Sequence, residues 1–276
     1  MSSADDPVTH YDQITRAWQY LLGEDFHYGY FKRMDEPLEV ATNNLTVLMA
    51  EKGRIGPDTS VLDVGCGIGS PACFLAERYG CRVTGISTSS AGIEDACRRA
   101  RERGCSDRVS FSSGDGMDNG MPDASFDRVW VLEASHLMPR KQALLAESAR
   151  VLRRGGSIVL CDIMPRRDLP RAEILRRARD YLHLHYAFGH AKLETLETYE
   201  RLARAAGLEV LESLDLSDSA FPTLAHWSRR LEENVEQVRA LIGDEGVEHF
   251  RASCAILPAL WKERSFGYGL IVAAKV

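Results

Sequence analysis

The stretch Ser60-Val-Leu-Asp-Val-Gly-Cys-Gly-Ile-Gly69 decides the fold of this chain. A short apolar run ends in three glycines at alternate positions, and an amphipathic stretch then extends from Pro71 to Tyr79, before Gly80. The apolar run predicts a buried strand and the amphipathic stretch predicts a helix. The order of strand, glycine loop and helix brings backbone N–H groups and a helix N-terminus to one ligand.

The same alternation continues along the chain. Apolar runs at residues 81–87, 108–115, 126–134 and 157–164 are interleaved with amphipathic stretches at 90–104 and 140–156. Alternating units of this length predict an α/β fold, with a mostly parallel sheet and helices on both faces. Two later strands, near residues 208–217 and 267–276, bring the sheet to seven strands, and we expect one of these two to run antiparallel at the sheet edge.

The pattern divides the chain into four parts. Residues 1–56 form an N-terminal helical extension with an aromatic turn at 26–31, and residues 57–163 form the core. Residues 164–260 are expected to form a helical lid and substrate region, interleaved with a returning core strand. Residues 261–276 supply the final core strand.

The composition is that of an ordinary globular protein. The 276 residues are 45% hydrophobic and 27% charged, with a net charge of −6, which disfavours a nucleic-acid partner. The sequence has no signal-peptide pattern at its start and no apolar run near the ~18 residues that span a bilayer. We therefore expect a cytoplasmic protein without membrane insertion. Seven cysteines without a CxxC pair predict reduced thiols, with neither a disulfide framework nor a zinc site.

The glycine spacing separates two kinds of nucleotide site. A dinucleotide fingerprint has glycines at its first, third and sixth places, but the sixth place counted from Gly65 is Ser70. A nicotinamide dehydrogenase is therefore the weaker interpretation. A plain tight turn between a strand and a helix is the other alternative.

Asp63-x-Gly65-x-Gly67-x-Gly69 resembles the motif of class I methyltransferases that bind S-adenosylmethionine. The segments RVSFSSGDGMD, FDRVWVLEASHLMPRK and VLRRGGSIVL resemble the next motifs of that superfamily, in the same order. YDQIT, FHYGYF and GYGLIVAAK extend the resemblance to small-molecule methyltransferases of natural-product, sugar and tocopherol type. The resemblance implies a Rossmann-like fold, S-adenosylmethionine as cofactor and S-adenosylhomocysteine as product.

The resemblance also implies which residues hold the cofactor. Asp115 corresponds to the acid that accepts from the adenine amino group, and His27 and Tyr11 to residues that close over the methionine end. The full set is Tyr11, His27, Asp63, Gly65, Gly67, Gly69, Ser87, Thr88, Asp115, Gly116 and Leu132. Ser87 stands where the usual acid binds the ribose, and Gly92 stands where relatives often have Gln, so one ribose contact is expected to be lost.

Methyl transfer to a hydroxyl requires a base, and His136, just past the fourth strand, is the first candidate. Asp162, at the end of the fifth strand, is the second. The simpler alternatives are packing beside the cofactor for His136 and a strand-end cap for Asp162. Glu133 also lies at the exit of the fourth strand, where solvation is the simple explanation of a charge.

An aromatic pocket wall is the hypothesis for the lid. The candidate substrate contacts are Tyr20, Tyr28, Tyr181, His185, Tyr186 and Phe188, with ordinary lid packing as the alternative. His183, His185 and His190 do not predict a metal site, because residues 183 and 185 of a helix point about 200° apart.

These observations predict a methyltransferase acting on an O, N or C atom of a small, largely apolar metabolite, aromatic, polyketide or isoprenoid, in natural-product or antibiotic biosynthesis. The partner is the acceptor molecule, and a homo-oligomer is left open. A cyclase or pericyclase that keeps the cofactor as a bound ligand is the first alternative. A small-molecule-binding protein without catalysis is the second.

Overall fold

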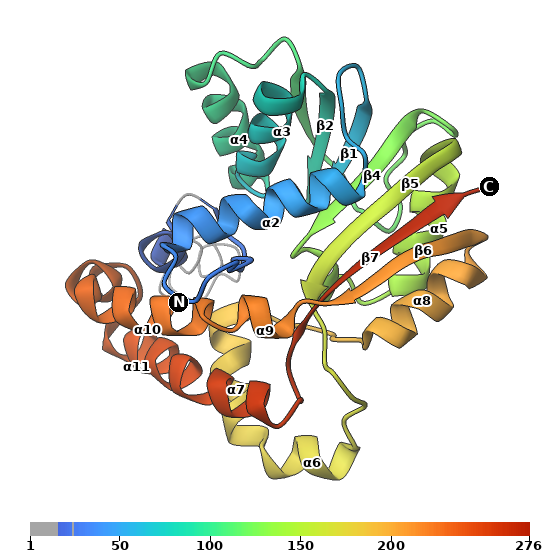
Figure 1. Cartoon of the computed structure of the whole chain (residues 1–276). Coiled ribbons are helices and arrows are strands. Elements are labelled where there is room, and N and C mark those ends of the chain that lie inside the picture. Colours follow the sequence, from blue (N-terminus) through green and yellow to red (C-terminus); the bar gives the residue numbers. More distant parts are fainter. Residues whose placement is uncertain (1–15, 24) are drawn as a thin grey trace, which may run out of the picture.

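A seven-stranded sheet forms the centre of the computed structural model, which describes residues 16–23 and 25–276 (Figure 1). The strand order is β3-β2-β1-β4-β5-β7-β6. The strands are β1 (Ser60–Val64), β2 (Arg82–Ser87), β3 (Val109–Ser113), β4 (Phe126–Leu132), β5 (Leu152–Ile163), β6 (Leu208–Asp215) and β7 (Tyr268–Lys275). Strands β1 to β5 run parallel to one another, as predicted.

The antiparallel strand is β7, which pairs with β5 on one side and β6 on the other. The prediction that the antiparallel strand lies at the edge is therefore wrong. The burial of the two strands gives the reason. The first six residues of β7 are buried, whereas only Leu208 of β6 is buried and Leu211 is 55% exposed. An evenly apolar strand is stable between two neighbours, and a strand whose side chains are mostly accessible to solvent is suited to an edge.

Helices cover both faces of the sheet. Side chains alternate along each strand, so Val61 and Trp130 join one buried cluster with residues of the helices α2 and α3, while Leu62 and Val129 join a second cluster with residues of α5 and α8. The covering helices are α2 (Leu38–Lys52), α3 (Ser70–Tyr79), α4 (Ser90–Glu102), α5 (Lys141–Val151) and α8 (Leu196–Ala205). The two clusters hold the carboxyl ends of β1 and β4 side by side.

A second group of helices lies where the lid is predicted, and these helices are called the lid helices (Figure 1). Helical residues 16–22 dock on them through Trp18, whose Nε1 donates to the carbonyl of Ala187 at 2.7 Å and whose ring packs 4.8 Å from Phe250. Helix α11 is broken at Gly243, which has a φ of 71°. The lid helices are α6 (Arg171–Arg176), α7 (Ala178–Phe188), α9 (Ser217–Ala220), α10 (Thr223–Glu233) and α11 (Val235–Lys262).

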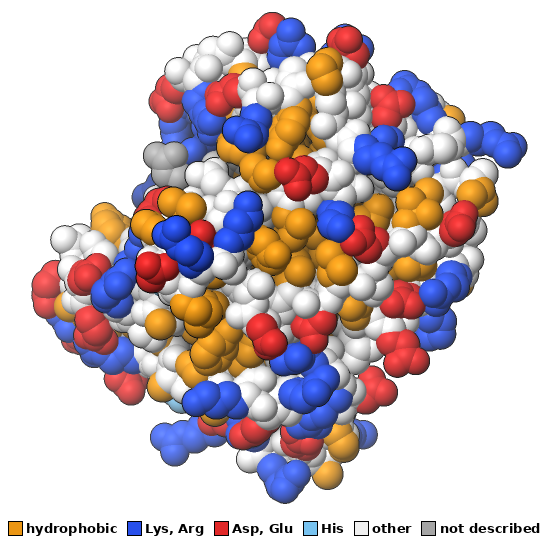
Figure 2. All heavy atoms as spheres, in the orientation of Figure 1, with side chains coloured by type: hydrophobic (Ala, Val, Ile, Leu, Met, Phe, Trp, Pro, Cys, Tyr) orange, Lys and Arg blue, Asp and Glu red, His pale blue; other side chains and the backbone are white. Residues whose placement is uncertain are grey.

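The face shown in Figure 2 intersperses positive and negative side chains with apolar ones. Among the described residues, no helix is both long enough and apolar enough to cross a membrane. All seven cysteines are free thiols, and six of them are buried.

Candidate active site

The three loop glycines all adopt left-handed backbone conformations, with φ values of 81° for Gly65, 53° for Gly67 and 77° for Gly69. A Cβ atom on Gly65 would lie 2.2 Å from Cβ of Ala134, so this position packs against the segment that follows β4. A Cβ atom on Gly67 would meet no described protein atom within 4 Å. The main chain at Gly67 is therefore open to a ligand, which fits the close approach that a nucleotide cofactor needs.

Two of the predicted cofactor residues have a buried polar atom without a hydrogen-bond partner among the described residues. These atoms are Oδ2 of Asp63, at the end of β1, and Nε2 of His27. Burial raises the pKa of Asp63 to about 7 and lowers the pKa of His27. Because an unpaired buried polar atom is costly, both atoms fit contacts with a bound ligand, as the methionine end of S-adenosylmethionine requires.

The residues expected at the adenosine end follow β2 and β3. Ser87 is half-buried at the end of β2, and Thr88 after it is exposed. Asp115 follows β3, and its Oδ1 accepts from the N–H of Met117 at 2.9 Å. A Cβ atom on Gly116 would lie 2.4 Å from Val64, so only glycine fits there. Leu132 is buried at the end of β4, and Tyr11 lies outside the described residues.

His136 and Asp162 form a hydrogen-bonded pair at the ends of β4 and β5. Nδ1 of His136 lies 2.8 Å from Oδ1 of Asp162, and the N–H of His136 donates to Oδ2 at 2.9 Å. Ser135 Oγ donates to Oδ2 at 2.5 Å and lies 2.7 Å from the hydroxyl of Tyr199. Because Ser135 has a single proton to donate, Tyr199 donates to Ser135. Asp162 thus accepts from the adjacent residues Ser135 and His136, and Tyr199 of α8 supports Ser135.

Each member of the pair of His136 and Asp162 stabilises the charged form of the other. Burial alone would raise the pKa of Asp162, but His136 and the surrounding donors hold it below its ordinary value. Burial alone would lower the pKa of His136, but the carboxylate of Asp162 raises it above its ordinary value. With Nδ1 directed at Asp162, Nε2 is the ring nitrogen that can take a proton from a substrate.

Two further ionisable side chains lie beside this pair. Glu133 has a left-handed φ of 47°, and its Oε1 accepts from the N–H of Tyr28 at 2.6 Å and from the hydroxyl of Tyr268 at 2.5 Å. Simple solvation therefore does not describe Glu133. Lys141 donates to the carbonyls of Ser135 and Met138, and burial lowers its pKa to about 8. No local sequence pattern indicates the contacts of Glu133, because Tyr28 and Tyr268 lie more than 100 residues from it.

The aromatic candidates do not form one wall. Tyr28 is completely buried and packs 4.5 Å from Trp227, which also contacts Phe188. Tyr186 stacks on His249 of α11 at 4.1 Å. Of the others, Tyr20 is 40% exposed, Tyr181 is half-buried on α7, and His185 is exposed beside His190.

His183 lies 3.1 Å from His249, between their Nδ1 atoms, and not with His185. No group of three or more potential metal ligands occurs within residues 16–23 and 25–276.

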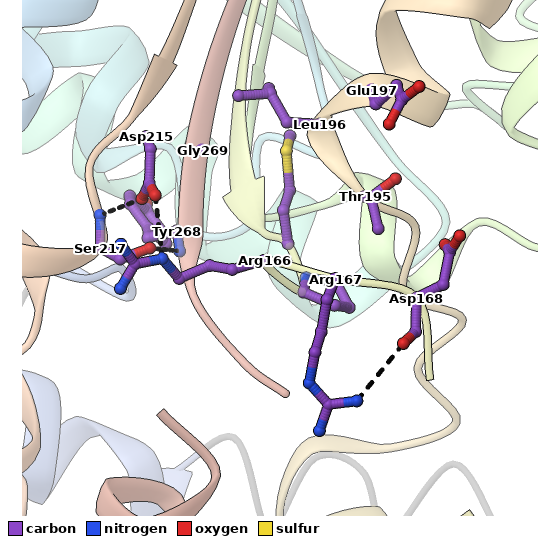
Figure 3. Close-up of a pocket in the computed structure, with 12 residues that line it drawn as sticks. Arg166, Arg167, Asp168, Thr195, Leu196, Glu197, Asp215, Ser217, Tyr268 and Gly269 are labelled. Carbon is purple, nitrogen blue, oxygen red and sulfur yellow. Dashed lines mark hydrogen bonds and ion pairs between the residues drawn. The ribbon is translucent and has the colours of Figure 1, made fainter. Parts of the chain in front are cut away.

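A surface cleft lies between the end of β5, the start of β7 and α8 (Figure 3). Arg166 reaches across it to Asp215, with Nε 2.9 Å from Oδ2, and Tyr268 forms part of its wall. None of the residues expected to bind cofactor or to act in catalysis lines this cleft.

Residues 2–261 match the family described as mycolic acid cyclopropane synthetase. The chain belongs to this family. It is 35% identical over 269 residues to a 27-O-demethylrifamycin SV methyltransferase of Amycolatopsis mediterranei, covering 96% of this chain and 95% of that protein. The cyclopropane synthase CmaA1, solved in complex with SAH and CTAB, has the same fold, with a TM-score of 0.84, 22% identity and coverage of 98% and 99%. The [4+2]-cyclase SpnF gives a TM-score of 0.83 at 26% identity, with coverage of 98% and 97%.

Membership of this family confirms the predicted Rossmann-like methyltransferase fold and the cofactor. The family member described here is an S-adenosylmethionine-dependent methyltransferase of small molecules.

Proposed function

We propose that this methyltransferase transfers a methyl group to a hydroxyl oxygen, with His136 as the general base. The observation that carries the proposal is the pair of His136 and Asp162, 2.8 Å apart. A hydroxyl is a poor nucleophile until its proton is removed, whereas a neutral amine needs no base before it attacks. A buried imidazole held by a carboxylate is therefore most useful to an oxygen acceptor.

Each residue of the pair has a distinct task. His136 takes the acceptor proton at Nε2 while the acceptor oxygen attacks the methyl carbon. Asp162 fixes the ring orientation through Nδ1 and stabilises the imidazolium that forms. Ser135 and Tyr199 keep the carboxylate in place. When bound, S-adenosylmethionine supplies a methyl group activated by its sulfonium, so the protein mainly aligns the reacting atoms and excludes water.

For the cofactor we propose the residues that the motifs indicate. Asp63 and His27 would hold the methionine end, where each has an unpartnered buried atom, and Tyr11 would close over it. Gly65, Gly67 and Gly69 would let the main chain approach the cofactor. Ser87 and Thr88 would contact the ribose, and the adenine would bind at Asp115, Gly116 and Leu132.

The acceptor is proposed to be a small, largely apolar natural product. The rifamycin methyltransferase, which covers almost the whole chain, supports this class. Tyr28 of the aromatic turn at residues 26–31 packs with Trp227 and Phe188 in an apolar cluster, and an apolar cluster at this place suits an apolar acceptor. The wider set of contacts from Tyr20, Tyr181, His185 and Tyr186 remains a hypothesis for larger acceptors. Seven free thiols support a reducing compartment such as the cytoplasm.

Turnover with S-adenosylmethionine and a panel of phenolic and hydroxylated polyketide acceptors tests this proposal by mass spectrometry. We expect a gain of about 14 Da, one S-adenosylhomocysteine per product and an unchanged carbon skeleton. Product of unchanged mass with the cofactor unconsumed would instead establish a cyclase, the activity named for SpnF. A methylated nitrogen or carbon would refute the O-methylation proposal. Calorimetry that detects no binding of either cofactor form would refute the assigned site.

A further inference from the structure

Residues 25–31, called the strap here, cross the carboxyl ends of two neighbouring strands. At one end, Asp25 Oδ1 accepts from Ser70 Oγ at 2.5 Å, directly after the glycine loop. At the middle of the strap, the N–H of Tyr28 donates to Glu133, directly after β4. Because β1 and β4 pair side by side, the strap spans the edge of the sheet where ligands of parallel α/β folds bind.

The strap also connects to the lid. The N–H of Gly29 donates to Thr223 Oγ1 at 3.0 Å, and the N–H of Phe31 donates to the carbonyl of Ser219 at 2.9 Å. The N–H of Tyr30 donates to the carbonyl of Ala41, on α2. The backbone donors of residues 28–31 are therefore distributed over the sheet, the lid and α2.

Between the two anchors lies His27. Its Nδ1 lies 2.8 Å from the carbonyl of Tyr28, and a carbonyl can only accept, so Nδ1 carries the proton. Nε2 is then an acceptor, and it is buried without a partner among the described residues, as is Oδ2 of Asp63. Two acceptors of this kind suit a ligand ammonium group, such as that of the cofactor's methionine end.

Glu133 has the geometry of an anchor. A left-handed φ in a residue other than glycine costs about 1 kcal/mol and is retained where the surroundings enforce it. Both of its accepted hydrogen bonds converge on Oε1, at 2.5 Å from the hydroxyl of Tyr268 and 2.6 Å from the N–H of Tyr28. Burial raises the pKa of Glu133 to about 8, and these two donors oppose that rise. Its own N–H donates to the carbonyl of Cys161 at 2.9 Å, which ties this residue to β5.

We propose that Glu133 is a positioning residue, which together with Asp25 anchors the strap over the methionine end of the cofactor and thereby sets cofactor affinity. Glu133 then acts through His27 and does not take the acceptor proton. This inference rests on the proposed cofactor site and adds the device that closes it.

Calorimetry of S-adenosylhomocysteine binding to the full chain tests the proposal. We expect Glu133→Ala to raise the Kd by 10-fold or more. Glu133→Gln, whose amide oxygen can accept both hydrogen bonds, should stay within 3-fold of the wild type. With saturating cofactor, kcat of Glu133→Ala should fall by less than 3-fold. A fall in kcat at unchanged Kd would make Glu133 a catalytic group and overturn the proposal.

A double-mutant cycle separates a strap with two anchors from two independent contacts. Once one anchor is released, loss of the other should change the Kd little. The double variant Glu133→Ala with Asp25→Ala should therefore bind S-adenosylhomocysteine no more than about 3-fold worse than whichever single variant has the higher Kd. As the matched comparison, Glu133→Ala with Asp115→Ala, at the adenine end, should multiply the two single effects. Multiplied effects in the Asp25 cycle would overturn the inference.

Ser70→Ala provides a milder test, because it releases the first anchor without changing a charge. The Kd should rise, and an unchanged Kd would overturn the proposal even if Glu133→Ala did not fold. If the wild-type protein binds no S-adenosylhomocysteine, the proposed cofactor site itself is wrong. If the wild type binds S-adenosylhomocysteine and the variants bind it with the same Kd, the cofactor site stands and only the proposed role of the strap is refuted.

Discussion

His136→Ala removes the proposed base and leaves the rest of the site in place. Asp162 accepts four hydrogen bonds, and three of them, from Ser135 Oγ, the N–H of residue 136 and the N–H of Ile163, do not need the imidazole. Breaking a buried ion pair typically costs about 3–5 kcal/mol, but the remaining donors should limit the loss of stability to about 1–3 kcal/mol. The variant should therefore fold.

The chemical step should slow by about 10²-fold or more with a hydroxyl acceptor, because a positioned base contributes about 10²–10⁴ in rate. Single-turnover formation of S-adenosylhomocysteine measures this step, and the Kd of the cofactor should stay within 3-fold of the wild type. His226→Ala, which removes a half-buried histidine on α10, is the control; because His226 stacks on Phe31 of the strap, it is measured with saturating cofactor, where the rate should be unchanged.

The pH profile gives an independent readout. His136 must be neutral to act as a base, and Asp162 raises its pKa, so the wild-type rate should increase with pH as the ring loses its proton above that raised pKa. The variant should lack this limb. For stability the sign is opposite: the contribution of His136 is complete below the unfolded pKa of about 6.5 and is lost as pH rises through the folded pKa. The wild type and His136→Ala should therefore differ most at acidic pH.

A single-turnover rate within 5-fold of the wild type, measured with a proven hydroxyl acceptor, would refute the assignment of His136 as base. A large loss that the His226→Ala control shares would indicate a general effect of losing a histidine. With a neutral amine acceptor, only a small loss is expected from His136→Ala.

Three further outcomes are expected. Gly67→Val should abolish S-adenosylhomocysteine binding by calorimetry, whereas Gly104→Val, at a glycine with a φ of 66° and equally open surroundings, should cost similar stability and retain affinity. Cofactor affinity should weaken as pH falls below about 7, where Asp63 takes up a proton. Asp63→Asn should weaken cofactor binding by 10-fold or more and remove that pH dependence. If the pH dependence persists in Asp63→Asn, another group causes it. Asp162→Asn should destabilise the protein by about 3 kcal/mol in thermal or denaturant unfolding and lower the pKa of His136, so that its remaining activity extends to lower pH, and an unmoved acidic limb would contradict the pairing.

Local pattern was sufficient for the core of the fold. The apolar run before Gly65 and the amphipathic stretch after Gly69 predicted β1 and α3, and the next repeats predicted β2 to β5. Local pattern did not predict the order of the last strands, in which β7 lies between β5 and β6. That order depends on how much of the apolar surface of β7 its neighbouring strands cover. The positions of His136 and Asp162 in the sequence predicted that they follow or end neighbouring strands. The structure shows that Nδ1 of His136 lies 2.8 Å from Oδ1 of Asp162.

The sequence by itself therefore determined the βα alternation, the glycine loop and the neighbouring strand ends that carry His136 and Asp162, because these follow from periodicities within a few residues and from the parallel order of strands. Only the tertiary structure decided that Glu133 accepts from Tyr28 and Tyr268, that Tyr199 supports Ser135, and that His183 meets His249. Those partners are between 64 and 135 residues apart, and no local pattern records which distant side chains share one buried space.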